Sequence, residues 1–560
     1  MRAPLRADTG ATVEAELGNR PVVQVWGARG MATSMHPLAS DAAVQVLRQG
    51  GNAVDAAIAL GAVISVTSHD WAGMAGDSAW LSYNAQGGEF HYLDGYSTCP
   101  ALARPERIRE HFGLDRNRNG RAFQEEPLDA RHTGVVTGMV PGTPAAWVEL
   151  SKRFGSMPFE RLLEPAIDLA RRGFPINEYF AGALDSNARK VCRFRSSVRI
   201  VCDDSGTVLR EGATLKQPDL ADTLDRLARH GHDGFYDGTT ADMIVQHCRR
   251  EGATIRHADL QEYRAKWRNV VAGTYRGFGV VVTAPPTAGL HVIQALNLLE
   301  RFDLGRLPYH GAASLHLLIE AVRLALRSRR EIGGDPDQRA IDVASFASKA
   351  YANMHRDAID IEHAGGGPTE ALPGNATTHF CVVDAARNVV TATQTVGSAF
   401  GCGEVIDGTG MFLNDRTWWM ALDGGPNVIA PSRRANIGHA PTVVMDGNRP
   451  LVALGSPGGF GIVQYVVQVL VNMLDYGIDL QRAIEVPRFR IEDLKGIVGI
   501  EQRAPAETRR ALSMMGHDIV DYPAWTDRVG GVEGVYIHPT ENVLLGGYDP
   551  RRNSLAAGFA

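Results

Sequence analysis

The stretch TTHFCVVDAARNVVTATQT, residues 377–395, decides how this chain arranges its chemistry. Two runs rich in β-branched residues flank the turn residues Ala385-Ala386-Arg387, a pattern that predicts a β-hairpin. Thr377 then stands at the start of one strand and Thr395 toward the end of its neighbour. We therefore expect the two threonine hydroxyls to approach each other.

The segment just before this hairpin predicts a cleavage point. Residues 362–376, EHAGGGPTEALPGNA, are rich in glycine and proline and lack periodicity, which indicates an exposed loop. Cleavage between Ala376 and Thr377 would give Thr377 a free amine beside its hydroxyl, and that amine can act as the base. We predict that Thr377 is the nucleophile of an amide hydrolase. Outside this context, a Thr-Thr pair is simply a strand-favouring dipeptide.

The flanking sequence predicts further helices and strands. Apolar residues at helical spacing are interrupted by Gly50-Gly51-Asn52, which indicates two helices joined by a tight turn. Helical patterns dominate residues 144–363, with one clear strand at 277–283. The remaining expected elements are a hairpin over residues 78–93, a buried strand over 450–456 and an apolar helix over 461–473, which follows Pro457-Gly458-Gly459.

Composition excludes several classes of function. The chain has 560 residues and a formal net charge of -6, and its basic residues alternate with acidic ones, so no nucleic-acid-binding surface is expected. Six cysteines show no paired short spacing, which excludes a zinc knuckle and a dense disulfide framework and favours reduced thiols. No segment reaches the roughly 20 continuous apolar residues of a spanning helix, and the N-terminus lacks a signal-peptide core. We expect a cytoplasmic, membrane-free protein without a metal or organic cofactor, because no ligand cluster has metal spacing.

Several motifs resemble one enzyme family along most of the chain. TTHFCVVDAARNVVTATQTVGSAFG, then GTGMFLND and ALGSPGG, resemble the γ-glutamyltransferase family of N-terminal-nucleophile hydrolases. The likeness covers roughly residues 28–550 in order and includes GGNAVDAAIAL near residue 50 and APPTAGLHVIQALNLLE near residue 284.

The resemblance implies an α+β protein with a four-layer αββα sandwich, synthesised as an inactive precursor that cleaves itself just before a threonine. It implies a loose leader over residues 1–27, a large subunit over 28–376 and a small subunit over 377–560. The two subunits are each other's partners, and a dimer of such heterodimers is left open. The resemblance also implies site roles: Thr395 orients Thr377, and the backbone N–H groups of Gly458 and Gly459 bind the oxyanion.

The residues that bind a γ-glutamyl group in the family are replaced here. The departing positions are Tyr96 in place of an arginine, Gly397 in place of an asparagine, Arg416 in place of a glutamine or glutamate, Trp419 in place of an aspartate, and Ile437-Gly438 in place of two serines. Both charged ends of a glutamyl moiety lose their partners. Unpaired buried charges are costly, so we expect glutathione to be a poor substrate.

The replacements themselves favour a small, negatively charged substrate. Arg416 adds a positive charge that can pair with a carboxylate, with Arg433, Arg434 and His439 following in sequence, and Trp419 adds bulk that narrows the site. Tyr96 completes the expected substrate-binding residues. We predict hydrolysis of a short carboxylate-bearing amide, as in the branch of the family that resembles oxamate amidohydrolase.

Three alternatives to this function stay open. They are a true γ-glutamyltransferase or glutathione hydrolase, a cephalosporin or glutaryl acylase, and an uncleaved binding protein. The joint presence of Thr377, Thr395, Gly458 and Gly459 argues against the last, because a binding scaffold needs none of them together.

Overall fold

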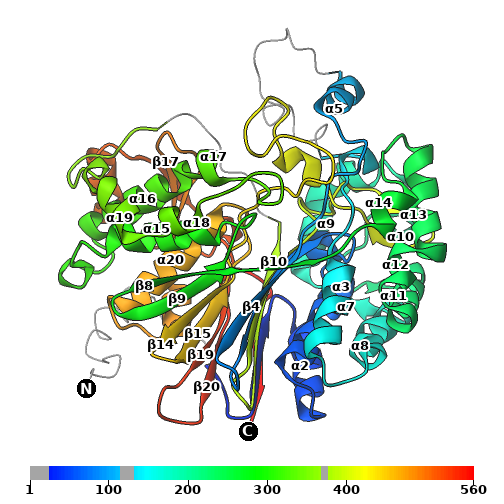
Figure 1. Cartoon of the computed structure of the whole chain (residues 1–560), viewed down its shortest axis with the longest axis horizontal. Coiled ribbons are helices and arrows are strands. Elements are labelled where there is room, and N and C mark those ends of the chain that lie inside the picture. Colours follow the sequence, from blue (N-terminus) through cyan, green and yellow to red (C-terminus); the bar gives the residue numbers. More distant parts are fainter. Residues whose placement is uncertain (1–23, 114–131, 368–375) are drawn as a thin grey trace.

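Two stacked β-sheets with helices on both outer faces form the protein (Figure 1). The computed structural model describes residues 24–113, 132–367 and 376–560. Each sheet has seven strands, and neighbouring strands within both sheets pair antiparallel. The four-layer αββα sandwich that the sequence predicted is confirmed.

The strands of each sheet come from distant parts of the chain. The first sheet has the order β1 (Val25–Gly27), β20 (Leu544–Gly547), β19 (Glu533–Ile537), β15 (Arg449–Gly455), β14 (Thr442–Asp446), β9 (Phe278–Thr283), β8 (Val270–Tyr275). The second has the order β21 (Leu555–Phe559), β2 (Gly30–Ser34), β10 (Thr378–Asp384), β11 (Val389–Thr395), β3 (Asp77–Asn84), β4 (Glu89–Gly95), β7 (Lys266–Arg268). Each sheet thus mixes strands from both sides of residue 376, so the two expected subunits share one core.

Helices cover the two outer faces. On the second sheet lie α2 (Pro37–Arg48), α3 (Ala53–Thr67) and α7 (Thr143–Phe154), with α8 (Phe159–Arg172), α11 (Pro218–His230) and α13 (Gly238–Arg250) further out (Figure 1). On the first sheet lie α15 (Gly289–Leu299) and α20 (Gly461–Leu474), with α16 (Ala312–Arg327) outside them. The predicted turn between α2 and α3 is confirmed. Asn52 caps α3 by accepting hydrogen bonds from two backbone N–H groups of its first turn, which fixes where that helix begins.

The predicted hairpins are confirmed, and two strands lie where the sequence predicted helices. β10 pairs with β11 and β3 pairs with β4, and the turn of the first hairpin places Arg387 at a φ of 68°. The sequence pattern predicted helices before residue 277, but β7 and β8 occupy 266–268 and 270–275. Their short, mixed polar runs gain strand structure only by pairing with β4 and β9, which is tertiary context.

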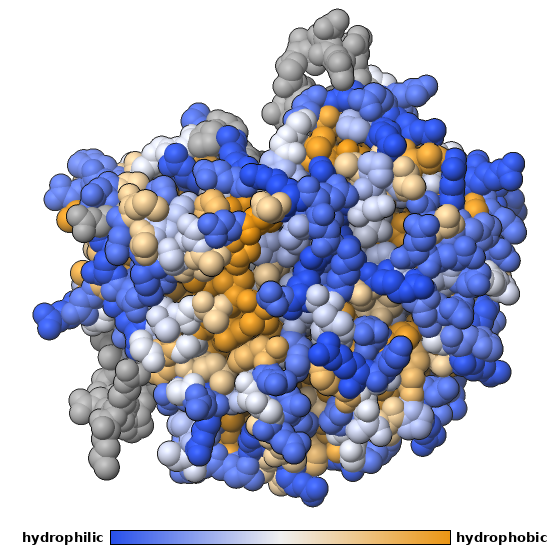
Figure 2. Space-filling view, in the orientation of Figure 1, coloured by the Kyte–Doolittle hydropathy of each residue, from blue (hydrophilic) through white to orange (hydrophobic). Residues whose placement is uncertain are grey.

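Three layers of apolar contact hold the sandwich together. The layer between the sheets contains Leu81, Cys381, Val443 and Val535, and larger clusters lie between each sheet and its helices. Figure 2 shows apolar side chains gathered in the middle of one face, over the edge of the first sheet near β9. No helix among the described residues could cross a membrane. Residues 1–23 of the expected leader and residues 368–375 of the predicted exposed loop lie outside the described residues. The prediction that residues 25–27 belong to a loose leader is wrong, because they form β1 by pairing with β20.

Candidate active site

The register of the strands brings four residues into one row across the second sheet. Three of them, Thr377, Thr395 and Tyr96, were predicted site residues, and the fourth is Asp77. Thr378 pairs with Gln394, Thr395 with Asp77, and Ser78 with Gly95. Extending two of these registers by one residue sets Thr377 opposite Thr395 and Tyr96 opposite Asp77. Directly opposed residues of an antiparallel sheet point to the same face. The row Thr377, Thr395, Asp77, Tyr96 therefore faces the interior between the two sheets, at one end of the second sheet.

Thr377 contacts the carbonyl group of the residue before it. Its hydroxyl lies at hydrogen-bonding range of the Ala376 carbonyl oxygen and 3.4 Å from the Thr395 hydroxyl. The Thr395 hydroxyl also donates to the Ala376 oxygen at 3.3 Å and accepts from the Gly397 N–H at 3.0 Å. Thr377 is 3% exposed, so the peptide bond and both hydroxyls are shielded from solvent. The structure brings the predicted pair together.

The turn that contains Gly458 and Gly459, here called the glycine turn, lies beside the start of β10. Gly455, at the end of β15, has no room for a side chain, because a Cβ would lie 2.2 Å from the His379 ring. His379 is two residues beyond Thr377 and points to the same face. The turn that follows β15 places Gly458 and Gly459 at φ values of 123° and 59°. Within the described part of the chain, the N–H groups of both glycines donate to no other group, which leaves them available to an anion at the start of α20.

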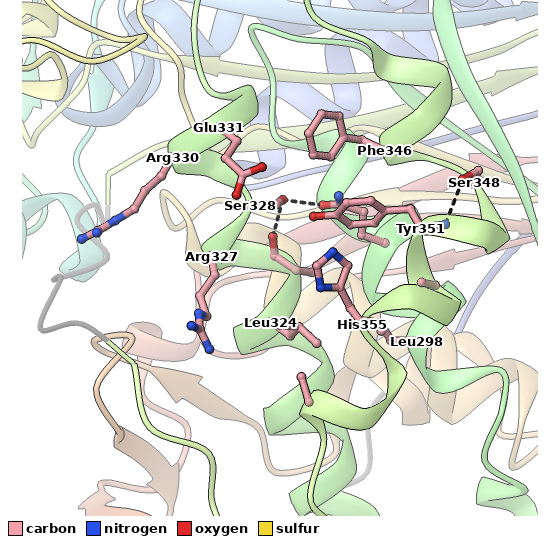
Figure 3. A pocket seen from close by; sticks show the side chains of 14 residues that line it. Leu298, Leu324, Arg327, Ser328, Arg330, Glu331, Phe346, Ser348, Tyr351 and His355 are labelled. Atoms are coloured by element: carbon pink, nitrogen blue, oxygen red, sulfur yellow. Dashed lines mark hydrogen bonds between the residues drawn. The ribbon is translucent and has the colours of Figure 1, made fainter.

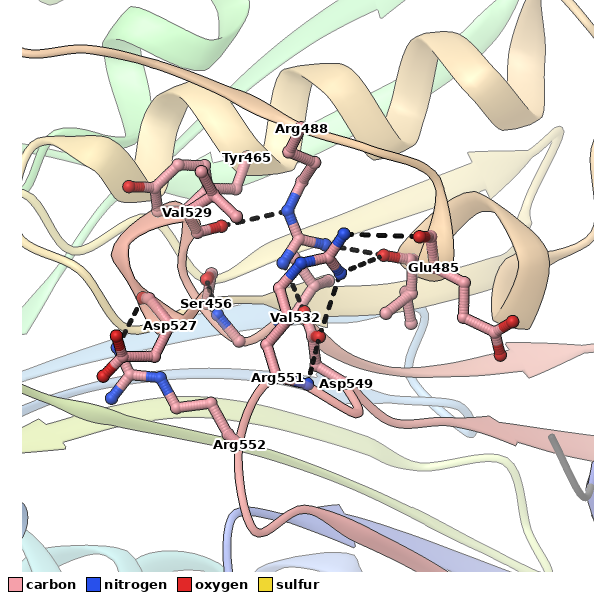
Figure 4. Close-up of polar contacts among 12 residues, drawn as sticks. Ser456, Tyr465, Glu485, Arg488, Asp527, Val529, Val532, Asp549, Arg551 and Arg552 are labelled. Atoms are coloured by element: carbon pink, nitrogen blue, oxygen red, sulfur yellow. Dashed lines mark hydrogen bonds and ion pairs between the residues drawn. The ribbon is translucent and has the colours of Figure 1, made fainter. Parts of the chain in front are cut away.

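A buried network of ion pairs and hydrogen bonds holds the loop over residues 527–532, which contacts the glycine turn (Figure 4). Arg488 forms an ion pair with Asp549, and its Nε donates to the Val529 carbonyl at 2.9 Å. Asp549 also accepts from the Val532 N–H at 2.9 Å. Burial opposes ionisation of Asp549, but the Arg488 and Arg551 guanidiniums hold the pKa of its carboxyl below the ordinary value. The loop over residues 527–532 is thereby held at Val529 by Arg488 and at Val532 by Asp549.

That loop in turn contacts the glycine turn. The Gly531 N–H donates to the Ser456 hydroxyl at 3.2 Å, and the Tyr465 hydroxyl donates to the Arg528 carbonyl at 2.8 Å. The Tyr465 ring packs where a side chain on Gly458 would lie, 2.8 Å from the Cβ position. The network around Arg488 therefore supports the turn through Ser456 and Tyr465.

Arg416 has an internal partner that the sequence did not reveal. It donates to both carboxylate oxygens of Asp77, from Nε at 2.6 Å and from an Nη at 2.8 Å, and each side chain is 1% exposed. Burial raises the pKa of Asp77 to about 6, and Arg416 opposes that rise. The positive charge of Arg416, which we expected to pair with a substrate carboxylate, is thus already neutralised by Asp77. Of the guanidinium nitrogens, Nη1 donates to no described residue.

Aromatic side chains join this ion pair to the glycine turn. The Trp419 ring lies 5.4 Å from the Arg416 guanidinium and 5.9 Å from the ring of Phe460, which directly follows Gly459. Tyr96 is fully buried, with its ring 5.3 Å from that of His439. The predicted residues Tyr96, Arg416 and Trp419 thus line one connected region beside the threonine row.

A second buried acid, Asp415, explains why position 397 is a glycine. A Cβ at Gly397 would lie 1.8 Å from a carboxylate oxygen of Asp415, and its φ is 107°. Asp415 accepts from the Ser398 N–H at 2.9 Å and pairs with His132 at 2.8 Å. Despite burial, His132 holds the pKa of the Asp415 carboxyl below its ordinary value. Asp77 and Asp415 were not predicted as site residues, although each follows a Gly or Asn next to a strand, in Gly76-Asp77 and Asn414-Asp415, which was a visible signal.

One cluster with metal-ligand chemistry lies elsewhere, among residues distant in sequence. Ligand atoms of His316, Glu320 and His517 all lie within 4.8 Å of one another. Arg323 donates to His517 Nδ1 at 3.3 Å, so His517 Nε2–H donates to His316 Nδ1 at 2.8 Å, and His316 Nε2–H donates to the Asp360 carbonyl at 2.7 Å. This chain of hydrogen bonds uses every ring nitrogen and ties residue 360, which precedes the cleavage loop, to α16.

A cavity of about 350 Å³ lies in another part of the first sheet's helical layer (Figure 3). Phe346, Tyr351 and His355 line one side of it, and Ser328 and Glu331 face them from the end of α16 and α17 (Arg329–Ile332). None of the predicted site residues lines this cavity.

The layers and the buried threonine at the start of a central strand define an N-terminal-nucleophile hydrolase. Solved structures agree: the crystal structure of cephalosporin acylase from Bacillus halodurans superposes with a TM-score of 0.86 at 28% identity, covering 97% of this chain and 98% of that one.

Sequence relatives narrow the class to one family. Residues 39–559 match the family model described as Gamma-glutamyltranspeptidase. The chain is 32% identical over 551 residues to "Glutathione hydrolase proenzyme" of Escherichia coli (strain K12), covering 95% of this chain and 92% of that protein. It is 33% identical over 521 residues to "Acylase ACY 1 proenzyme" of Pseudomonas sp. (strain SE83), covering 92% and 90%. The chain belongs to the gamma-glutamyltranspeptidase family, and it is a hydrolase.

Proposed function

We propose that the protein is an autocleaving amidohydrolase whose nucleophile is Thr377. One observation carries this proposal: the Thr377 hydroxyl lies against the carbonyl of Ala376, which Thr395 also contacts at 3.3 Å. Attack of the hydroxyl oxygen on that carbonyl carbon breaks the C–N bond and forms an ester. Water then hydrolyses the ester, leaving Ala376 as a carboxylate and Thr377 with a free amine and hydroxyl.

The same residues can then act on a substrate amide. The new amine takes the hydroxyl proton as the Thr377 oxygen attacks the substrate carbonyl, and the N–H groups of Gly458 and Gly459 stabilise the oxyanion. The proton passes to the leaving amine, and water hydrolyses the acyl-enzyme. Thr395 keeps the nucleophile oriented, and Gly397 in turn holds the Thr395 hydroxyl.

We propose a short carboxylate-bearing amide, such as oxamate, as the substrate. A γ-glutamyl substrate carries an α-ammonium group that needs an acid, but the acid in the row, Asp77, is already paired with Arg416, and Asp415 beside Gly397 is already paired with His132. Trp419 fills space in the same region. The Nη1 of Arg416 is available to donate to a substrate oxygen. Arg416 can therefore bind a carboxylate through a hydrogen bond, although Asp77 already neutralises its charge.

An acylase acting on a bulkier amide is the second candidate. It is supported by the 33% identity to the Pseudomonas acylase and by the superposition on cephalosporin acylase. Glutathione hydrolysis remains the third, supported by the Escherichia coli relative.

Ammonia or amine release from purified, cleaved protein tests this proposal. We expect turnover of oxamate to exceed that of a γ-glutamyl anilide and of a glutaryl amide in kcat/KM. The Thr377→Ala protein should stay uncleaved and inactive, because both reactions need the hydroxyl. Equal or faster turnover of the γ-glutamyl anilide would restore the glutathione hydrolase assignment, and faster turnover of the glutaryl amide would establish the acylase.

A further inference from the structure

Several fully buried polar atoms near the Arg416–Asp77 pair have no hydrogen-bond partner among the described residues. They are both ring nitrogens of His439, the hydroxyl of Tyr96 and the indole N–H of Trp419. His439 and Tyr96 are 0% exposed, and Trp419 is 5% exposed. A buried polar group without a partner normally destabilises a fold, and native proteins keep few of them. A ligand bound beside the Arg416–Asp77 pair would supply the missing partners.

His439 lies between the glycine turn and the ion pair. A Cβ on the preceding residue, Gly438, would lie 1.9 Å from the Gly459 carbonyl oxygen, so the backbone around His439 passes directly along the turn. On its other side the His439 ring meets the edge of Tyr96 at 5.3 Å. Arg416 and His379 are close enough to act on its charge. His439 therefore lies beside the glycine turn and Tyr96, two features that flank the threonine row.

The protonation states of these groups define which chemistry they can bind. Burial, aided by Arg416 and His379, keeps the pKa of His439 well below its ordinary value, so the ring is neutral and offers one donor and one acceptor. Burial keeps the pKa of Tyr96 well above its ordinary value, so its hydroxyl stays protonated. The Trp419 indole can only donate. The region is thus rich in neutral donors.

We propose that His439, together with Tyr96, determines specificity by binding the oxygen-rich acyl end of the substrate, a carboxylate or α-oxo acid group. This inference rests on the proposed function and names the residues that select its substrate. Three donors among these groups match carboxylate and carbonyl oxygens, whereas an ammonium group would find no unpaired acid and only two neutral acceptors, a His439 ring nitrogen and the Tyr96 hydroxyl oxygen. The region therefore selects acceptor-rich acyl groups and rejects the amino end of a glutamyl moiety.

Two variants of His439 test the proposal against a purely structural role. His439→Phe keeps a planar ring without polar atoms, and His439→Gln keeps a donor and an acceptor. For oxamate, we expect His439→Phe to lower kcat/KM by about 10-fold to about 100-fold, the usual effect of losing one hydrogen bond to a charged group. His439→Gln should recover most of that loss. Hydrolysis of acetamide, which has a methyl group in place of the carboxylate, should change less than about threefold.

Binding of oxalate, the carboxylate product, gives a readout that is independent of turnover. Calorimetry on the cleaved proteins should show a Kd at least about tenfold weaker for His439→Phe and for Tyr96→Phe than for the native protein. If His439→Phe fails to cleave itself, Tyr96→Phe alone carries the comparison. An unchanged oxalate Kd in every cleaved Phe variant would overturn the inference. Native protein that neither hydrolyses oxamate nor binds oxalate would instead overturn the proposed substrate.

Discussion

Replacing Asp549 by asparagine should disturb both the fold and the glycine turn. The Asp549 carboxylate is fully buried and accepts hydrogen bonds from Arg488, from the Val532 N–H at 2.9 Å, and from Arg551 through its backbone N–H at 3.0 Å and its side chain at 3.1 Å. The NH2 group of an asparagine at this position would face N–H groups that now donate to a carboxylate oxygen. The substitution would also remove the negative charge that the buried guanidiniums of Arg488 and Arg551 pair with. Breaking a buried pair in this way costs about 3–5 kcal/mol.

The free energy of unfolding can be measured on a single chain. In the Thr377→Ala background, which should stay uncleaved, urea denaturation should show Asp549→Asn less stable by about 3–5 kcal/mol. Glu164→Gln is a matched control, because the Arg161–Glu164 pair is 58% and 54% exposed and should contribute under about 1 kcal/mol.

The kinetic effect of Asp549→Asn follows from the contacts of the loop over residues 527–532. If that loop moves, Ser456 and Tyr465 no longer hold the glycine turn, so kcat should fall while KM stays within about twofold. Loss of one oxyanion donor lowers kcat by about 100-fold to about 1,000-fold, which sets the upper range. A stability change below about 1 kcal/mol together with an unchanged kcat would refute the assigned role of this network.

Three further outcomes are expected. Thr395→Val removes the hydroxyl at constant size, and should slow self-cleavage at least about tenfold in a gel time course; an unchanged rate would remove Thr395 from the mechanism. The pKa of the Asp415 carboxyl is lowered in the folded protein, so its stabilising contribution is present above its unfolded pKa of about 3.9 and is lost as the pH falls through the folded value. Asp415→Asn should therefore flatten that part of an acid denaturation curve. An identical curve for the variant and the native protein would contradict this assignment. The Cys192 and Cys202 sulfurs lie 3.7 Å apart near the surface, so oxidised glutathione should join them in a disulfide, with loss of two hydrogens, while buried Cys248 stays reduced; peptide mapping without reductant would detect either result.

The sequence predicted the parts of the fold that depend on local patterns. The hairpin over residues 377–395 was predictable because β-branched runs flank a short turn, and the α2–α3 turn because Gly50-Gly51-Asn52 interrupts a helical period. Strands β7 and β8 were missed because their sequences take strand structure only from β4 and β9, far away along the chain.

The site was predictable in its catalytic half and less so in its substrate half. Thr377, Thr395 and the glycine turn follow from motifs whose members the sheet register brings together. The partner of Arg416 is Asp77, 339 residues away, and no local signal connects the two. The role of His439 likewise depends on what surrounds it, because a single histidine is ordinarily a packed residue.

The proposed mechanism depends on cleavage of the Ala376–Thr377 bond, which would make Thr377 the N-terminus of the shorter chain. Intact-mass analysis of the purified protein with N-terminal sequencing tests this step most directly. We predict two chains of 376 and 184 residues that co-purify, because both sheets contain strands from each, with Thr377 as the first residue of the shorter one. An intact 560-residue chain with full activity, or a shorter chain that begins at another residue, would contradict it.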